Sequence, residues 1–193
     1  MIGTSGDNVL SVDNRFNDGS VGVTFHGLGG NDTLIGSIGA DLLHGGQGDD
    51  ILKGSSGRDS LFGGGRKDKL TGGAGSDTLN GGGGHDTLIG GNGRDFLDGG
   101  KGNDLSIGGK GWDVLTGGAG KDTFVFGPGS GRDRVTDFEI GADILSISGH
   151  VGGFDALTIA NQGGSLRITH DGGVILLQGE AGTILTAADF EFV

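Results

Sequence analysis

Residues 72–98 read GGAGSDTLNGGGGHDTLIGGNGRDFLD, which is three consecutive copies of one nine-residue unit. The unit continues without a gap in both directions, from residue 27 to residue 125, and so occurs eleven times. Glycine dominates its first, second and fourth positions, every copy has aspartate at the sixth, and ten copies have a large apolar residue at the eighth. A short period of this kind is typical of a solenoid, in which each unit stacks on its neighbours.

Each unit is predicted to divide into a six-residue loop and a three-residue strand. Because side chains alternate along a strand, the eighth residue should point inward and the seventh and ninth outward. With two units in each coil, every strand stacks on the strand two units later. The predicted inner walls are Leu34, Leu52, Leu70, Leu88, Ser106 and Phe124 on one side, and Leu43, Leu61, Leu79, Leu97 and Leu115 on the other. Ser106 is the one polar residue in these columns, so we expect a weak layer there.

The segment before the repeats, residues 1–26, is predicted to be an N-terminal cap. GTSGDNVLS at residues 3–11 matches the unit except that Asn8 stands where aspartate belongs, which indicates a degenerate first unit. The remaining residues break the period and favour two strands around a turn at Asn17-Asp18-Gly19. End units of a solenoid need a different outer face, and this segment fits that role.

The uninterrupted repeat block is residues 27–125, and residues 126–193 follow it. This last segment contains the only proline of the chain and several runs in which apolar residues alternate with polar ones. Such runs favour strands, and Asp171-Gly172-Gly173 is a predicted hairpin turn. We therefore expect an antiparallel β cap on the end of the roll.

Composition points to a partner that supplies stability. The chain has 49 glycines, 33% hydrophobic residues and a formal net charge of −12, so its core alone would not offset the ordering entropy. Eleven of its 25 acidic residues are repeat aspartates, whose carboxylates would repel one another once stacked. The acidity argues against nucleic acid as a partner. With no cysteine there is no thiolate site, and no apolar run is long enough for a membrane span or an N-terminal leader.

The loops offer oxygen ligands for a metal ion. Glycine permits positive φ, so carbonyl groups can converge with one carboxylate from each loop. About six oxygen ligands suit Ca²⁺, whereas Mg²⁺ keeps its water and zinc prefers His or Cys. Eleven loops stacked two units apart form nine pairs, and we predict up to nine calcium ions between them. The predicted carboxylate ligands are Asp32, Asp41, Asp50, Asp59, Asp68, Asp77, Asp86, Asp95, Asp104, Asp113 and Asp122.

The consensus GGxGxDxUx, where U is a large apolar residue, resembles the RTX, or hemolysin-type calcium-binding, repeat. GGQGDDILK, GGAGSDTLN, GGGGHDTLI and GGNGRDFLD match it at every position. Residues 117–148, GGAGKDTFVFGPGSGRDRVTDFEIGADILSIS, are also similar to the end of the roll in serralysin-type metalloproteases and other RTX exoproteins. The resemblance implies an all-β fold, a right-handed parallel β-roll with two nonapeptides per coil.

The resemblance also implies how two stacked loops share one ion. The earlier loop gives the carbonyl groups of its second and fourth positions and its aspartate, and the later loop gives its first and third carbonyl groups and its aspartate. Carried onto this sequence, the carbonyl ligands are Leu28, Gly30, Ser37, Gly39, Gly45, Gly46, Gln47, Gly48, Gly54, Ser55, Ser56, Gly57, Gly63, Gly64, Gly65, Arg66, Gly72, Gly73, Ala74, Gly75, Gly81, Gly82, Gly83, Gly84, Gly90, Gly91, Asn92, Gly93, Gly99, Gly100, Lys101, Gly102, Gly108, Lys110, Gly117 and Ala119. Arg66 replaces a fourth-position glycine, so we expect strain at positive φ and the weakest site between Asp68 and Asp86. Leu28, Ser37 and Ser55 are milder departures, because only a carbonyl group is needed there.

These features predict a calcium-binding module that folds outside the cell. Without calcium the carboxylates keep the repeats unfolded, and with calcium the binding free energy becomes folding free energy. The resemblance implies a secreted, extracellular protein that type I secretion machinery recognises through an uncleaved C-terminal signal. The ending LTAADFEFV is the candidate signal, and an ordinary strand end is the competing interpretation. A start on a degenerate repeat favours a module with an upstream catalytic or adhesive domain, and a small standalone RTX protein is the alternative.

Enzymatic activity is not expected, because the chain has no HExxH or GxSxG motif and its five histidines are not grouped with acids. The alternative function is a calcium-dependent polysaccharide- or surface-binding module, as in the repeat modules of alginate epimerases. Arg58, Ser76, Arg94 and Trp112 occupy the fifth position of alternate loops and would form a row one strand spacing apart. The basic and aromatic members, Arg58, Arg94 and Trp112, could grip an acidic sugar chain. A solvated loop edge is the competing interpretation of this row.

Overall fold

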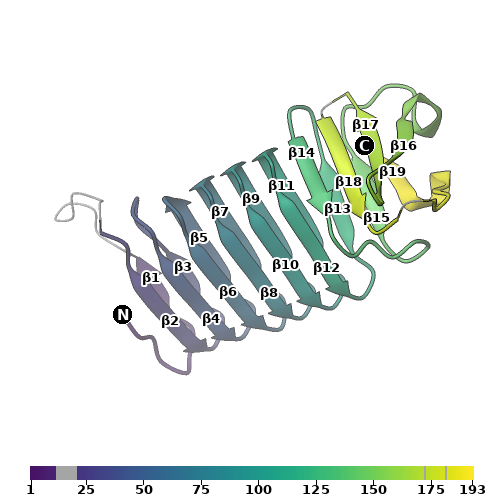
Figure 1. Ribbon diagram of the computed structural model, residues 1–193. Coiled ribbons are helices and arrows are strands. Elements are labelled where there is room, and N and C mark those ends of the chain that lie inside the picture. The colour runs from purple at the N-terminus through teal and green to yellow at the C-terminus, as the bar shows by residue number, and fades with distance from the viewer. Residues whose placement is uncertain (12–20, 172, 181) are drawn as a thin grey trace.

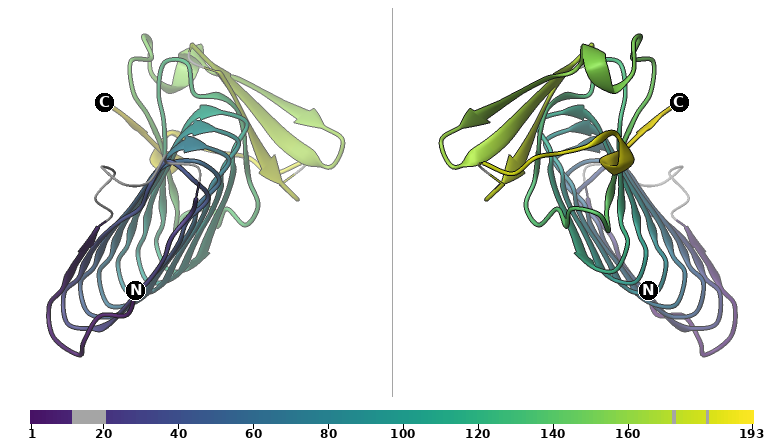
Figure 2. Two further views of the ribbon diagram at one scale, coloured as in Figure 1. Left: turned by 90° about the vertical axis from the view of Figure 1, so that its left-hand side faces the viewer. Right: turned by 90° about the vertical axis from the view of Figure 1, so that its right-hand side faces the viewer.

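The computed structural model describes residues 1–11, 21–171, 173–180 and 182–193. These residues form an all-β parallel solenoid of about seven turns. Figure 1 shows the coils following one another from the N-terminus to the C-terminal strands, and Figure 2 shows the two rows of strands enclosing a narrow interior. The predicted β-roll is confirmed.

Two rows of parallel strands build the roll. Each strand from β1 to β13 pairs with the strand two places on, and β14 and β15 then pair with β18 and β19. The first row is β1 (Val9–Ser11), β3 (Thr33–Ile35), β5 (Ile51–Ser56), β7 (Lys69–Gly75), β9 (Thr87–Gly93), β11 (Leu105–Gly111), β13 (Thr123–Phe126), β15 (Ile144–Ile147) and β19 (Phe190–Phe192). The second row is β2 (Thr24–Gly29), β4 (Leu42–Gln47), β6 (Ser60–Gly65), β8 (Thr78–Gly83), β10 (Phe96–Lys101), β12 (Val114–Ala119), β14 (Gly131–Val135) and β18 (Gly173–Gln178).

Most strands inside the block are longer than predicted, although β3 has the expected three residues. β5 has six residues and β7 has seven, where three were expected. Their register pairs Leu52 with Leu70 and resumes in the following loop, where Ser55 pairs with Gly73. Because identical loops stack in parallel, their backbones continue the hydrogen-bonded ladder beyond the apolar strand.

The core is the pair of apolar columns predicted from the eighth positions. All predicted leucines of both walls and Phe124 are buried, with exposed fractions of 0–2%. The columns extend beyond the repeat block, through Leu10 and Phe25 at one end and Val135 and Leu145 at the other. Ser106 is buried in register between Leu88 and Phe124, and its hydroxyl has no hydrogen-bond partner among the described residues. The layer that was expected to be weak therefore contains an unpaired hydroxyl group enclosed by apolar side chains.

At the N-terminal end, β1 stacks on β3 with Leu10 opposite Leu34, as expected for a degenerate unit. The backbone N–H of Asn8 donates to Asp32 Oδ1 at 2.7 Å, so Asn8 takes the aspartate's place in the stack. The predicted Asn17-Asp18-Gly19 turn, with the first of its two strands, lies outside the described residues.

The C-terminal end combines parallel and antiparallel strands. β16 (Thr158–Gln162), β17 (Ser165–His170) and β18 are antiparallel neighbours, while β18 and β19 also extend the two parallel rows of the roll. The predicted turn lies between β17 and β18, and its Gly172 is outside the described residues. Two 3-10 turns, η1 (Phe154–Ala156) and η2 (Ala187–Asp189), complete the segment. No helix in the described part of the chain is long and apolar enough to cross a membrane.

Candidate metal centre: the aspartate columns

The repeat aspartates form two buried columns, one along each edge of the roll. In each column, one carboxylate oxygen, Oδ1, accepts the backbone N–H of the aspartate two units earlier, at 2.7–2.9 Å. The first aspartate column is Asp32, Asp50, Asp68, Asp86, Asp104 and Asp122, and the second is Asp41, Asp59, Asp77, Asp95 and Asp113. All eleven side chains are at most 3% exposed. Backbone stacking thus brings together carboxylates that are far apart in sequence.

The second carboxylate oxygen, Oδ2, has no hydrogen-bond partner in ten of the eleven repeat aspartates. At Gly72, a Cβ atom would lie 2.5 Å from Asp77 Oδ2 and 2.8 Å from the carbonyl oxygen of Gly90. The unpaired oxygen and the first-position carbonyl of the later loop therefore both border the space beside Gly72. This space is open because glycine has no side chain. Since Oδ1 faces the earlier loop and Oδ2 the later one, a carboxylate can contribute to a site on each side.

The remaining carbonyl groups point into the same gap between stacked loops. A Cβ atom at Gly91 or Gly93 would clash with the carbonyl oxygen of the matching position two units earlier, so second- and fourth-position carbonyl groups face the later loop. The third-position carbonyl faces back, because Gly57 N–H donates to Ala74 O at 2.8 Å. The positive φ angles of the second- and fourth-position glycines make this arrangement possible, for example 115° at Gly73.

Six oxygens consequently surround each gap between regular loops, two from carboxylates and four from the backbone. Between the loops ending at Asp77 and Asp95, the carbonyl groups come from Gly73, Gly75, Gly90 and Asn92. No group of three or more His, Cys, Asp or Glu side chains suited to a metal occurs in the described segments, so a cation here would depend on backbone oxygens. A set of hard, mostly neutral oxygens fits Ca²⁺.

Burial makes these carboxylates poor anions in the absence of a cation. Desolvation, aided by neighbouring aspartates in the column, raises the pKa of Asp59, Asp68 and Asp95 to about 7. The pKa of Asp122 rises to about 6 for the same reasons. A bound divalent cation would reverse this effect, because it stabilises the ionised form of each carboxylate.

The loop that ends at Asp41 departs from the others. Asp41 Oδ2 accepts the N–H of Ser37 at 2.6 Å, and the Ser37 hydroxyl donates to Asp41 Oδ1 at 2.9 Å. Neither Ser37 nor Gly39 has the positive φ of the other loops. Two units on, Ser55 has φ of 87°, as a second-position residue of the other loops does. This loop pairs its own carboxylate through Ser37, which is a larger departure than the sequence indicated.

Arg66 has the expected positive φ, 81°. A fourth-position Cβ points toward the earlier loop, so the Arg66 side chain leaves the backbone on the side of Asp50 rather than Asp86. The hydrogen bond from Gly48 N–H to Gly65 O is 3.2 Å long, compared with 2.7 Å for Arg66 N–H to Gly83 O. We therefore place the crowding between Asp50 and Asp68, one gap earlier than the gap between Asp68 and Asp86 predicted from the sequence.

Two further aspartates extend the columns and were missed from the sequence. Asp133 Oδ1 accepts the N–H of Asp113 at 3.1 Å, and Asp143 Oδ1 accepts the N–H of Asp122 at 2.9 Å. The signal is present as GRDRV at 131–135 and GADIL at 141–145, which match positions four to eight of the unit. Insertions shift these aspartates 20 and 21 residues from their partners instead of 18, which hides the period.

The model of the RTX calcium-binding nonapeptide repeat family matches this chain four times, at residues 26–61, 53–88, 62–97 and 98–133. The chain belongs to this family. Its RTX repeats bind calcium. The aspartate side chains of these repeats come together in the two aspartate columns of the roll. No curated protein matches the chain significantly.

Solved structures with similar chains include an extracellular lipase and two subunits of an epimerase. The extracellular lipase LipA from Serratia marcescens is 21% identical, with a TM-score of 0.41, over 85% of this RTX chain and 40% of the lipase chain. The AlgE6R2 and AlgE6R3 subunits of the Azotobacter vinelandii mannuronan C5-epimerase are 27% and 22% identical, with TM-scores of 0.38 and 0.34. They match 83% of this chain and 92% and 77% of their own. This chain thus spans less than half the length of the lipase.

The row of fifth-position side chains on the second edge is also present. Arg94 lies over the Phe96 ring at 5.8 Å, and Trp112 is 61% exposed. The structure adds Arg132, which lies over the Trp112 ring at 5.2 Å and was not predicted. A depression of about 350 Å³ is lined by Arg58, Arg94 and Phe96, so part of the row borders a hollow.

Proposed function

We propose that this RTX chain folds when calcium binds between its stacked loops after export, and that it stabilises an exported protein. The observation that carries the proposal is the pair of buried aspartate columns with unpaired Oδ2 atoms. Without a cation, each column places buried carboxylates beside one another and leaves their oxygens unsatisfied, which opposes folding. A cation in each gap neutralises two carboxylates and satisfies the converging carbonyl groups, so binding and folding become one equilibrium.

The nine gaps between the eleven loops are the proposed sites, and they are not equivalent. The gap between Asp77 and Asp95 lies between two loops that both have glycine at the first, second and fourth positions. The gap between Asp41 and Asp59 has an earlier loop already paired within itself, so it should bind calcium more weakly. The Arg66 side chain leaves the backbone toward the gap between Asp50 and Asp68, so this gap is a second proposed weak site.

The export signal is proposed to lie in residues 185–193. In the folded chain this segment is part of the roll, because Leu185 and Phe190 are buried and β19 pairs with β15. Thr186 and Asp189 form a reciprocal capping box around η2. The segment is therefore accessible to type I secretion machinery only while the chain is unfolded, which is the state expected at the low calcium concentration inside a cell.

Limited proteolysis tests the proposal on the full chain. In millimolar calcium we expect protease-resistant repeats, and in chelator we expect cleavage throughout residues 27–125, because the unfolded state exposes its backbone. Magnesium at the same concentration is the control and should give little protection, because it retains its water ligands. Equal resistance in calcium and in chelator would contradict calcium-dependent folding.

A second function, binding of an acidic polysaccharide, is favoured by the row that contains Arg58, Arg94, Trp112 and Arg132. Arg94, Trp112 and Arg132 follow one another at one strand spacing, about 4.8 Å, and Arg58 lies two spacings before Arg94, beyond Ser76. The row combines cationic groups with an exposed aromatic face. Such a row can pair with carboxylates along an extended polymer and stack on its sugar rings.

Substitution of Arg94 tests this second function. We expect Arg94→Ala to weaken calcium-dependent binding to an immobilised polyuronate about five- to tenfold, the effect of losing one charge-assisted contact of about 1 kcal/mol. Lys121→Ala removes an equal charge at a fifth position on the opposite edge and should leave binding unchanged. Equal affinities for the two variants, or no binding by the wild type, would exclude the row as a polyuronate site.

A further inference from the structure

The C-terminal segment carries a β-hairpin that stands out from the roll. Strands β16 and β17 are antiparallel neighbours, and β17 also pairs with β18, which belongs to the second row of the roll. Figure 2 shows this green hairpin projecting to one side of the coils. β16 pairs with β17 and with no other strand of the described chain, so it forms the outer edge of this sheet.

The turn that joins the two strands fixes which backbone groups lie on the free edge. Gly163 and Gly164 have φ of 57° and 86°, as in a type I′ turn, so the two strands exchange hydrogen bonds at the residue pair that closes the turn. In an antiparallel ladder, such pairs alternate with pairs that exchange none. The backbone of Ala160 therefore bonds to β17, whereas Ile159 and Asn161 direct their N–H and C=O groups away from it.

The sequence of β16 does not protect this edge against pairing with another strand. Natural edge strands are usually blunted by a charged side chain, a proline or a bulge. β16 reads TIANQ and has none of these, and the side chains of Thr158, Ala160 and Gln162 are exposed on one face. On the other face Ile159 packs against the core, which holds the strand in place.

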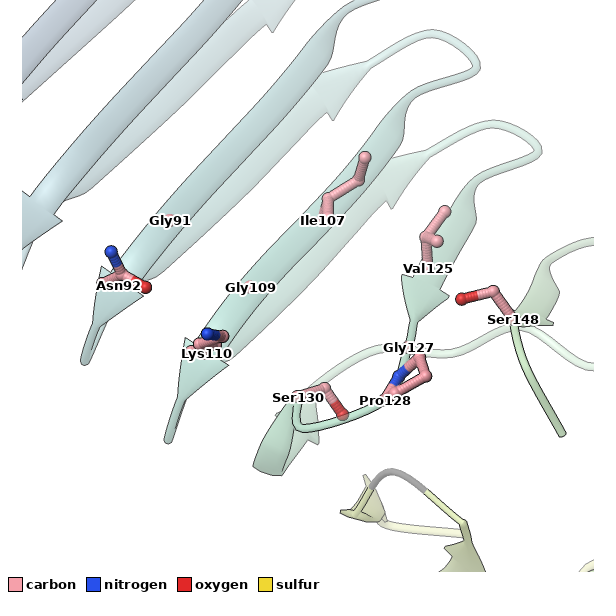
Figure 3. A pocket seen from close by; sticks show the side chains of 10 residues that line it. All are labelled: Gly91, Asn92, Ile107, Gly109, Lys110, Val125, Gly127, Pro128, Ser130 and Ser148. Atoms are coloured by element: carbon pink, nitrogen blue, oxygen red, sulfur yellow. The ribbon is translucent and has the colours of Figure 1, made fainter.

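The depression shown in Figure 3 does not offer a comparable edge. It has a volume of about 340 Å³ and is bordered by Ile107, Val125 and Pro128, among others. Ile107 and Val125 lie on β11 and β13, and each of these strands is paired on both sides within the first row. Another strand has no free backbone groups to join there, so β16 is the better docking edge.

The free edge of β16 is complementary to a second copy of itself. When two β16 strands pair antiparallel about a two-fold axis at Ala160, Ile159 exchanges two hydrogen bonds with the partner subunit's Asn161, and the symmetry supplies two more. Ala160 then faces the partner subunit's Ala160 in a pair without hydrogen bonds, where side chains lie closest together. Alanine fits that position because its side chain is a single methyl group.

Charge does not oppose this pairing. Arg167 of β17 lies beside Ala160, so in the paired sheet it is three strand spacings, about 14 Å, from its symmetry copy. That distance exceeds the screening length of about 8 Å at physiological salt. The exposed side chains that meet across the axis are the uncharged ones of Thr158, Ala160 and Gln162.

We propose that the folded chain forms a two-fold dimer through antiparallel pairing of β16 with the β16 strand of a second copy. The pairing uses the free edge of both hairpins, so the assembly closes at two chains. One strand from each chain buries less than the about 1,600 Å² of a standard interface, so the association should be weak and depend on protein concentration. This self-association goes beyond calcium-dependent folding and requires only that the chain be folded.

Sedimentation equilibrium of the full chain in millimolar calcium tests the dimer. Over a hundredfold range of protein concentration, the mass of the wild-type chain should rise from 19.2 kDa toward twice that value. Ala160→Lys places like charges opposite each other at the two-fold axis and should weaken association by about tenfold or more, as should Ala160→Asp. An equimolar mixture of the two variants should regain the dimer, because opposite charges then face each other across the axis.

Ala40→Lys is the matched control, because Ala40 is an exposed alanine near the N-terminal end of the roll, and this variant should associate as the wild type does. Hydrogen exchange supplies a second readout. The outward amide of Asn161 should exchange more slowly at high protein concentration, whereas the amide of Ala160, which is bonded to β17, should be equally protected at every concentration.

A wild-type chain that is folded by circular dichroism yet monomeric at every concentration would overturn the proposal. So would a dimer that persists in Ala160→Lys, a mixture of the two variants that stays monomeric, or masses above two chains. If an Ala160 variant does not reach the wild-type circular dichroism, the exchange of Asn161 in the wild-type chain decides, and exchange independent of concentration overturns the dimer. Failure of the wild-type chain to fold in calcium would instead contradict the calcium-dependent folding proposed above.

Discussion

Asp77→Asn is expected to lower the free energy of unfolding at saturating calcium by about 3–5 kcal/mol, as for a buried charge that loses its partner. Asp77 lies in the middle of the second aspartate column, with Oδ1 toward Asp59 and Oδ2 toward Asp95. Its substitution by Asn removes one negative charge from two gaps at once. Isothermal titration should therefore find about two fewer tightly bound ions, and urea unfolding in excess calcium should show the lower stability.

In chelator the same substitution should have the opposite effect. Burial raises the pKa of Asp77, which means that the folded, metal-free chain resists ionisation of this carboxyl group. Asn is neutral at every pH and removes that penalty, so residual structure in chelator should increase. Opposite effects on stability in calcium and in chelator distinguish a metal ligand from a residue that only stabilises its own turn.

Asp41→Asn is the matched comparison. Asp41 lies in the same column, but both of its oxygens already accept hydrogen bonds from Ser37. We expect it to reduce the calcium stoichiometry by at most one ion and to lose stability in chelator as well as in calcium. Equal effects of Asp41→Asn and Asp77→Asn under both conditions would contradict the distinction between the two loops.

A metal-free roll is expected to gain stability as the pH falls. The pKa of Asp59, Asp68 and Asp95 is about 7 in the folded chain and close to the ordinary 3.8 in the unfolded chain. The folded state consequently binds more protons, and stability is fully present below about pH 4 and is lost as the pH rises through 7. In calcium, stability is expected to fall as the pH falls, because protons compete with the cation for the same carboxylates.

Circular dichroism of calcium-depleted protein between pH 8 and pH 4.5 measures this effect at constant ionic strength. Two groups oppose it, since burial lowers the pKa of His44 and His170 and their protonation disfavours the fold. They are outnumbered by eleven column aspartates with a raised pKa. Asp68→Asn should flatten the profile. A metal-free chain that loses structure on acidification would contradict the account.

The period of the sequence was sufficient to predict the fold, because it specifies both the apolar columns and the stacking partner of every loop. Leu52 and Leu70 are in register, with an aspartate two positions before each, as the nine-residue spacing requires. Composition alone would have suggested disorder. The position-specific glycines and aspartates, rather than the amount of apolar surface, carried the prediction.

What the period could not predict depends on contacts of particular residues that the consensus unit does not contain. Ser37 looked harmless because a carbonyl needs no particular side chain, yet its N–H and hydroxyl bind the Asp41 carboxylate, and its loop lacks the positive φ of the others. Asp133 and Asp143 were hidden because insertions changed their spacing while the stacking contact was kept.

The most direct test of the central claim is a calcium titration of the full chain at pH 8, followed by far-ultraviolet circular dichroism together with Trp112 fluorescence. We expect a largely unfolded spectrum in chelator and a single steep transition to β structure as the calcium concentration rises. The fluorescence of Trp112 should change over the same calcium range, because loop 108–113 folds together with its neighbours. A chain that is fully folded in chelator, with neither signal altered by calcium, would contradict it.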